Sequence, residues 1–73
     1  MCLAVPLKLV SVEGKNGVGE FEGIGRRVRL DFVPAALPGD YVLVHAGFAI
    51  EIVQAEQAEA ERRDYAEVIH AAP

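Results

Sequence analysis

The chain has 73 residues and a formal charge of −4, and 52% of its residues are hydrophobic. This length predicts one small domain over residues 1–73, and the single cysteine and two histidines exclude an internal disulfide and a closed four-ligand zinc site. No apolar run reaches the roughly 20 residues of a membrane helix, and the start of the chain lacks the basic region of a secretory signal, so we expect a cytoplasmic protein.

The charge is distributed unevenly along the chain. Residues 1–50 hold five basic and five acidic side chains, whereas residues 51–73 hold two basic and six acidic ones and therefore carry the whole deficit. A nucleic-acid-binding module normally shows a basic excess, and only Arg26, Arg27 and Arg29 suggest one. Solvent-facing strand positions beside Glu20 and Glu22 explain these arginines, so we expect no nucleic-acid partner. Because no apolar run is long enough for a membrane helix, we expect no membrane partner either.

The first half of the chain is patterned for strands. Residues 5–12 mix apolar, polar and β-branched side chains and lead into a turn signal at residues 14–17. Residues 18–22 and 24–32 then alternate, which is typical of half-buried antiparallel strands. In the second of these strands, one face collects the apolar side chains that we expect to be buried, Ile24, Val28, Leu30 and Phe32.

A loop, two further strands and a helix follow. Residues 34–40 contain two prolines and a glycine and predict a loop, after which residues 41–46 and 48–53 are β-forming, with a bend at Gly47. From Gln54 the composition changes to helix formers, and an apolar stripe recurs at helical spacing. We therefore expect a mainly β fold, a small five-stranded barrel over residues 1–53 with a C-terminal helix over residues 54–70, whose stripe is Ala55, Ala58, Arg62, Tyr65 and Ile69.

Cys2 directly follows the initiator methionine. Removal of Met1 would leave a terminal residue bearing a thiol and an α-amine, whose reference pKa values are about 8.5 and about 8. The two groups could chelate one metal, or either could act as a nucleophile. An incidental thiol at a chain end is the alternative, and position alone favours it, although Pro6 stiffens the segment that follows.

His45 ends an apolar strand beside two small residues, Ala46 and Gly47, where another chain or a ligand could approach the backbone. A histidine there could bind a metal, move a proton or orient a cysteine. A hydrogen-bonded histidine in a packed bend explains the position equally well. His70 lies near the end of the predicted helix, where the helix dipole is a sufficient explanation.

Two segments together carry a family signal, residues 1–6 (MCLAVP) and residues 38–50 (PGDYVLVHAGFAI), with residues 25–30 (GRRVRL) between them. They resemble the HypC/HupF family of NiFe-hydrogenase maturation chaperones, over residues 1 to about 68. The resemblance implies an OB-like β-barrel with a C-terminal helix, acting as a chaperone without enzymatic turnover.

The resemblance also implies a cargo, partners and site residues. Such a protein holds an Fe(CN)2CO centre transiently, together with the scaffold protein HypD, and delivers it to the hydrogenase large-subunit precursor, with no permanently bound cofactor. Cys2 would be the key ligand, and His45 either a further iron ligand or a partner contact. The residues expected to bind partners are Cys2, Leu3, Val5, Pro6, His45, Gly47, Phe48 and Ala49.

Two other classes of function compete with this interpretation. An enzyme with an N-terminal cysteine nucleophile and His45 as its base would need those two groups within hydrogen-bond reach. A nucleic-acid-binding OB module would need aromatic side chains on a basic face. The chain offers no third orienting residue for the enzyme, and most of its aromatic residues lie at core-like positions or on the helix.

Overall fold

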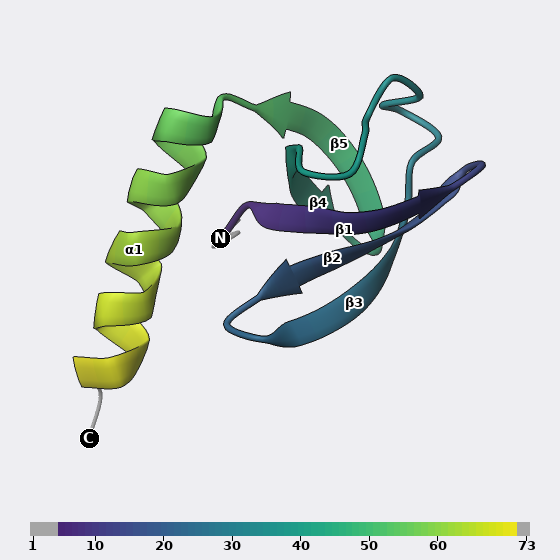
Figure 1. The fold of residues 1–73 in the computed structure, drawn as a ribbon. Helices are drawn as coiled ribbons and strands as arrows, with labels where there is room; N and C mark the ends of the chain where they lie inside the picture. Colours follow the sequence, from purple (N-terminus) through teal and green to yellow (C-terminus); the bar gives the residue numbers. More distant parts are fainter. Residues whose placement is uncertain (1–4, 72–73) are drawn as a thin grey trace.

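The fold is a five-stranded barrel followed by one helix, seen in a computed structural model that describes residues 5–71, with side chains through residue 67 (Figure 1). The predicted mainly β architecture with a C-terminal helix is confirmed. Its elements are β1 Leu7–Glu13, β2 Asn16–Phe21, β3 Ile24–Arg29, β4 Tyr41–His45, β5 Phe48–Val53 and α1 Ala55–Ala71.

The strands close in the order β1-β2-β3-β5-β4. Three antiparallel hairpins join neighbouring strands, and an antiparallel contact between β1 and β4 closes one side of the barrel. The other closure is a short parallel contact at Arg29↔Phe48, where the Arg29 N–H donates to the Gly47 carbonyl at 2.8 Å. Closure pairs the edges that an open sheet would expose.

Tight turns connect the strands within two of the hairpins, β2–β3 and β4–β5. Glu22–Gly23 and Ala46–Gly47 occupy the two central turn positions, and all four residues have positive φ, at 54°, 81°, 54° and 86°. Positive φ at both central positions is the pattern of a type I′ turn, whose twist matches that of paired strands. The bend predicted at Gly47 is therefore confirmed. The turn predicted over residues 14–17 is too long by its last two residues. Asn16 already belongs to β2, where it pairs with Glu13 of β1.

The core extends from the barrel interior into the loop after β3. Within this loop the Val33 N–H donates to the Leu30 carbonyl, and the Ala36 N–H donates to the Val33 carbonyl, at 3.1 and 3.0 Å. Successive turns thus fold the loop back over the barrel and bury two of its side chains. The core cluster comprises Leu9, Val28, Leu30, Val33, Ala36, Val42 and Ala49.

The alternation predicted for residues 24–32 holds for only two of its four apolar residues. Val28 and Leu30 are buried, but Ile24 and Phe32 are each 66% exposed. Ile24 directly follows the β2–β3 turn, and Phe32 comes after β3 has ended at Arg29, so strand parity no longer directs its side chain inward.

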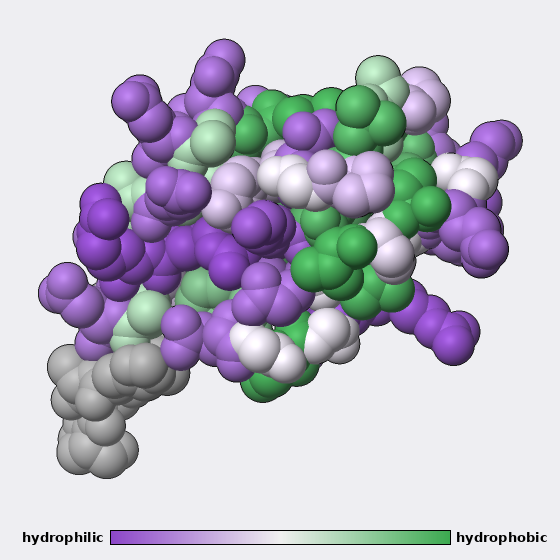
Figure 2. Space-filling view, in the orientation of Figure 1, coloured by the Kyte–Doolittle hydropathy of each residue, from purple (hydrophilic) through white to green (hydrophobic). Residues whose placement is uncertain are grey.

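Phe32 instead packs on the half-buried Phe48, with ring centroids 5.6 Å apart. Apolar surface of this kind gathers over the barrel, whereas the helix side is mostly hydrophilic (Figure 2).

Helix α1 packs on the barrel through a small, fully buried residue. The Ala58 N–H donates to the Gln54 carbonyl at 2.8 Å, and the Ala58 side chain joins Tyr41 and Val53 in a second apolar cluster. The absence of a larger side chain lets the helix approach the strands closely. Ile69 of the predicted stripe lies beyond the described side chains. In residues 5–71, no helix is long and apolar enough to cross a membrane.

Candidate functional site

An open groove of about 530 Å³ brings the start of the described chain together with the β4–β5 turn. It lies where β1 begins, between the β2–β3 hairpin, that turn and the side of α1. Val5, from the N-terminal segment that carries the family signal, therefore lies at one surface with Ala46 and Gly47, which follow it by 41 and 42 residues in the sequence. The groove is lined by Val5, Leu7, Phe21, Ile24, Arg26, Val44, Ala46, Gly47 and Tyr65.

The predicted site residues divide between this surface and the interior. Cys2 and Leu3 lie outside the described residues. Val5 is half-buried and Gly47 exposed, and both line the groove. Pro6 and Ala49 are buried, so their side chains support the barrel and offer no surface to a partner in this conformation.

His45 is exposed at the end of β4, where it pairs in register with Phe48. Phe48 is 38% exposed on the outer face of β5. Among residues 5–71 no three His, Cys, Asp or Glu side chains are grouped as a metal site. A metal bound by Cys2 and His45 would therefore need further ligands, because two protein groups do not complete a coordination shell.

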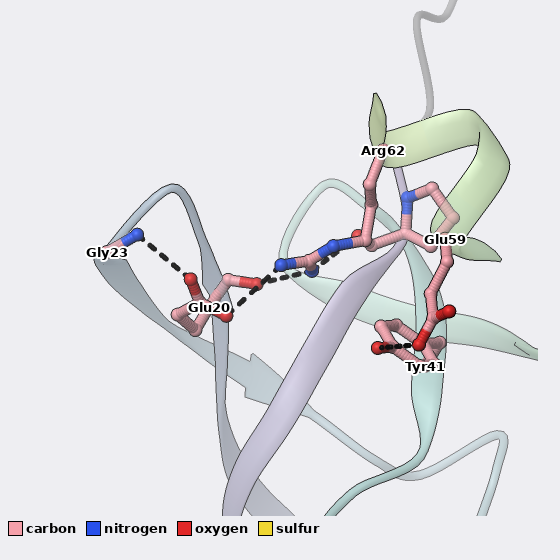
Figure 3. A network of polar contacts seen from close by, with 6 residues as sticks. Glu20, Gly23, Tyr41, Glu59 and Arg62 are labelled. Atoms are coloured by element: carbon pink, nitrogen blue, oxygen red, sulfur yellow. Dashed lines mark hydrogen bonds and ion pairs between the residues drawn. The ribbon is translucent and has the colours of Figure 1, made fainter. Parts of the chain in front are cut away.

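A network that sequence reasoning missed lies beside this groove, centred on Arg62 of α1 (Figure 3). Its Nη1 donates to the carbonyl oxygens of Pro6 and Glu20 at 3.1 and 2.8 Å, and its Nη2 donates to Glu20 Oε1 at 3.2 Å. The guanidinium also lies 5.1 Å from the ring centroid of Phe21 and 5.4 Å from that of Tyr41. One side chain thus joins the helix to the beginning of β1 and the end of β2.

A charged residue within an otherwise apolar helical stripe was the signal for this network. Sequence reasoning placed Arg62 between Ala58 and Tyr65 and set Glu20 among the arginines of β3. In the structure Glu20 pairs with Arg62 instead, and Arg29 pairs with Asp31 at 2.8 Å. Spacing could indicate that Arg62 faces the barrel, but only the fold supplies the carbonyl groups it reaches.

The surroundings of the Glu20 carboxylate lower its pKa and so favour its ionised form. It accepts a hydrogen bond from the Gly23 N–H at 2.9 Å, and this bond is the largest cause that lowers the pKa of Glu20. Desolvation opposes the shift, and the Arg62 hydrogen bond and charge add to it.

On the other side of the network, the Tyr41 hydroxyl donates to Glu59 Oε2 at 3.1 Å. Burial, followed by this hydrogen bond, raises the pKa of Tyr41. The helix is thus attached by a second polar contact that does not involve the start of β1.

Glu20→Gln is expected to lower the thermal stability at neutral pH and to change its pH dependence. Because folding lowers the pKa of Glu20, its carboxylate stabilises the fold above the ordinary value of 4.5, and this contribution is lost as the pH falls through the folded value. The gap in melting temperature between wild type and variant should therefore close in acid. Melting curves across that range test this, with Glu13→Gln at an exposed strand end as control. A gap that widens in acid would contradict the assignment.

Comparison of the sequence with known proteins identifies a family and several relatives. The model of the HupF/HypC family matches residues 1–64. A hydrogenase maturation factor HypC of Cupriavidus necator is 38% identical over 74 residues, covering 100% of this chain and 82% of the relative. HypC of Synechocystis sp. is 42% identical over 74 residues (93% and 97% covered), and the hydrogenase maturation factor HybG of Escherichia coli K12 is 37% identical over 67 residues (82% of each).

Proposed function

The chain belongs to the HupF/HypC family, and on that premise we propose that it is a hydrogenase maturation chaperone that carries an iron centre and has no catalytic turnover of its own. The names of its relatives support this reading, since those at 38% and 42% identity over most of the chain are called hydrogenase maturation factors. The small size of the protein also suits a carrier, because its barrel interior is filled with apolar side chains and leaves little room to enclose a substrate.

The proposed cargo is Fe(CN)2CO, held jointly with a HypD-like scaffold protein and passed to the large-subunit precursor of a NiFe-hydrogenase. Cys2 supplies the thiolate, a soft ligand suited to low-spin iron that carries carbonyl and cyanide. His45 contributes either a further ligand or a contact with the partner. A site that is incomplete on one protein favours release of the centre, because the remaining ligands leave with the partner. We propose that this work takes place in the cytoplasm, because a lone thiol stays reduced there.

The observation that carries the proposal is the meeting of Val5, Ala46 and Gly47 at one groove. Cys2 precedes Pro6 by four residues, and a fully extended segment of that length spans at most about 14 Å. This length sets only the greatest distance that can separate Cys2 from the buried Pro6. A partner seated over the groove would meet the segment that bears Cys2 and the turn next to His45 together.

Isolation of the chain with its maturation partners tests this function. The wild-type protein, expressed with a HypD-like scaffold and purified by a tag on its own C-terminus, should bring the scaffold and iron with it. The complex should show infrared bands of iron-bound carbonyl and cyanide. A scaffold that co-purifies without these bands would argue against the cargo, and failure to co-purify would argue against the partner.

A further inference from the structure

Arg26 lies on the face of β3 that points into the barrel further along the strand. It shares its strand parity with Val28, which is 3% exposed in the core, and residues two apart on a strand point to the same side. Arg26 pairs in register with Gly19, as Val28 does with Gly17. Unlike Val28, however, Arg26 is exposed and lines the groove. A charged side chain therefore stands at an inward-facing position where the barrel opens.

Apart from this arginine, the groove is lined by apolar or aromatic residues and one glycine. Two of them, Leu7 and Val44, also pack against the barrel core. The rings of Phe21 and Tyr65 meet edge to face at 5.7 Å, and Ile24 is 66% exposed. The volume of about 530 Å³ lies within the range of roughly 300–1,000 Å³ that is common for binding pockets. The groove can therefore take up a large apolar side chain.

The turns that border the groove leave room for a second protein chain. A side chain at Gly47 would begin with no atom of a non-adjacent residue within 4 Å, and the same is true of Gly23 in the β2–β3 turn. Gly47 lines the groove together with Ala46, and Gly23 precedes Ile24, which also lines it. Because small residues stand at these two turns, the backbone of another protein can approach the groove closely.

The ion pairs of the chain leave the Arg26 guanidinium available. Among the side chains described in residues 5–67, Arg29 pairs with Asp31 and Arg62 pairs with Glu20, and Arg26 takes part in neither pair. The residues that line the groove include no carboxylate. A guanidinium presents its donors in a planar fork that fits a carboxylate with two parallel hydrogen bonds.

A protein that covered the groove would take this charge out of water. A buried charge without a partner is strongly unfavourable, so the covering surface has to bring an anionic group for Arg26. A second copy of this chain does not meet that need groove to groove. A contact about a twofold axis uses the same patch on both copies, and would therefore set Arg26 against Arg26. The complementary surface belongs to a different protein.

We propose that the groove docks a segment of the scaffold protein in which a large apolar side chain stands beside a carboxylate. The apolar side chain contacts Phe21, Ile24 and Tyr65, and the carboxylate accepts hydrogen bonds from Arg26. This inference rests on the proposed function, which supplies the scaffold, and it adds the chemistry by which the scaffold is recognised.

Binding of the full-length chain to a purified HypD-like scaffold tests the charged contact. Arg26→Met should weaken binding roughly tenfold or more, because it leaves the carboxylate of the scaffold buried without its partner. The matched control is Arg27→Met, the same change at the adjacent arginine. Arg27 points to the opposite face of β3, where it lines a second depression with Ser11 and Val18, and its loss should change binding less than twofold. Both variants alter exposed side chains and should melt as wild type does.

The apolar contact has its own matched pair. Ile24→Asn should also weaken binding roughly tenfold, whereas Ile50→Asn, at an isoleucine of β5 that is 50% exposed and does not line the groove, should leave binding within twofold of wild type. The photoreactive residue p-benzoylphenylalanine, placed at Ile24, should cross-link to a scaffold segment in which Asp or Glu lies near a large apolar residue. Changing that carboxylate to lysine should restore binding to Arg26→Glu.

Equal binding by Arg26→Met and wild type, an equal loss in Arg27→Met, or a cross-linked segment without a carboxylate would overturn the inference. In each case the scaffold still binds wild type, so the proposed function stands. A scaffold that does not bind wild type overturns both. Sedimentation of the isolated chain should show a monomer, and a dimer that Arg26→Met dissociates would assign the groove to a second copy and refute the docking of the scaffold there.

Discussion

Cys2→Ala is expected to remove the carbonyl and cyanide infrared bands from the purified complex and to abolish hydrogenase maturation in cells. Cys2 is the only thiol of the chain, so no other side chain can supply a soft sulfur ligand in its place. The variant should keep its fold, because the two described core clusters and the residues packed on them lie within residues 7–58. Its free energy of unfolding should stay within about 0.5 kcal/mol of wild type.

The matched comparison is His45→Ala, at the other expected site residue. Its exposed side chain contributes little to the core, so this variant should also fold. If the thiolate is the principal ligand, the bands should weaken in His45→Ala but persist, whereas they vanish in Cys2→Ala. Normal maturation by Cys2→Ala would refute the proposed role of the thiol. Complete loss of the bands in both variants would contradict the principal role given to the thiolate, because the histidine would then be equally necessary, as a ligand or as a partner contact.

Leu30→Ala is expected to produce a large loss of stability. Leu30 directly follows β3 and is 2% exposed. Its Cδ1 lies 3.1 Å from the point where a side chain on Gly17 would begin, so it fills space that the glycine leaves open. Removing such a side chain costs about 2–5 kcal/mol in transfer and cavity terms. Ordinary domains have about 5–15 kcal/mol in total, and a chain this short is expected near the low end. Urea unfolding should show a much lower midpoint.

Leu37→Ala is the control for this measurement. It makes the same chemical change in the loop between β3 and β4, at a side chain that is 63% exposed. Its effect should stay within about 0.5 kcal/mol, because little apolar area is returned to water. Equal losses in the two variants would mean that the core does not depend on Leu30 as its burial implies.

The strands and the helix were predictable because their signals are local. Alternation, glycine at a turn and a helical composition after Gln54 each depend on residues within a few positions of one another. Predictions of burial failed at the two ends of the alternating stretch. Ile24 and Phe32 share the parity of Val28 and Leu30, but Ile24 is the first residue of β3, directly after a turn, and Phe32 lies beyond the end of β3.

The candidate site was predictable only in its parts. The N-terminal motif and the segment over residues 38–50 indicated the family, which the match to residues 1–64 confirms. That both segments line one groove follows from the closure of β4 and β1 and from the β4–β5 turn, and no local pattern contains that information. The assignment of Cys2 and His45 as ligands remains a prediction.

By itself, the sequence determined the order of the strands and the helix, the tight bend at Gly47 and the family, because each is expressed by neighbouring residues or by a motif. Only the tertiary structure decided which apolar side chains are buried and where Arg62 binds. Its acceptors, the carbonyls of Pro6 and Glu20, are 56 and 42 residues away in the chain. Backbone carbonyls are present at every residue, so no side-chain pattern marks which of them a distant arginine will reach until the barrel has closed.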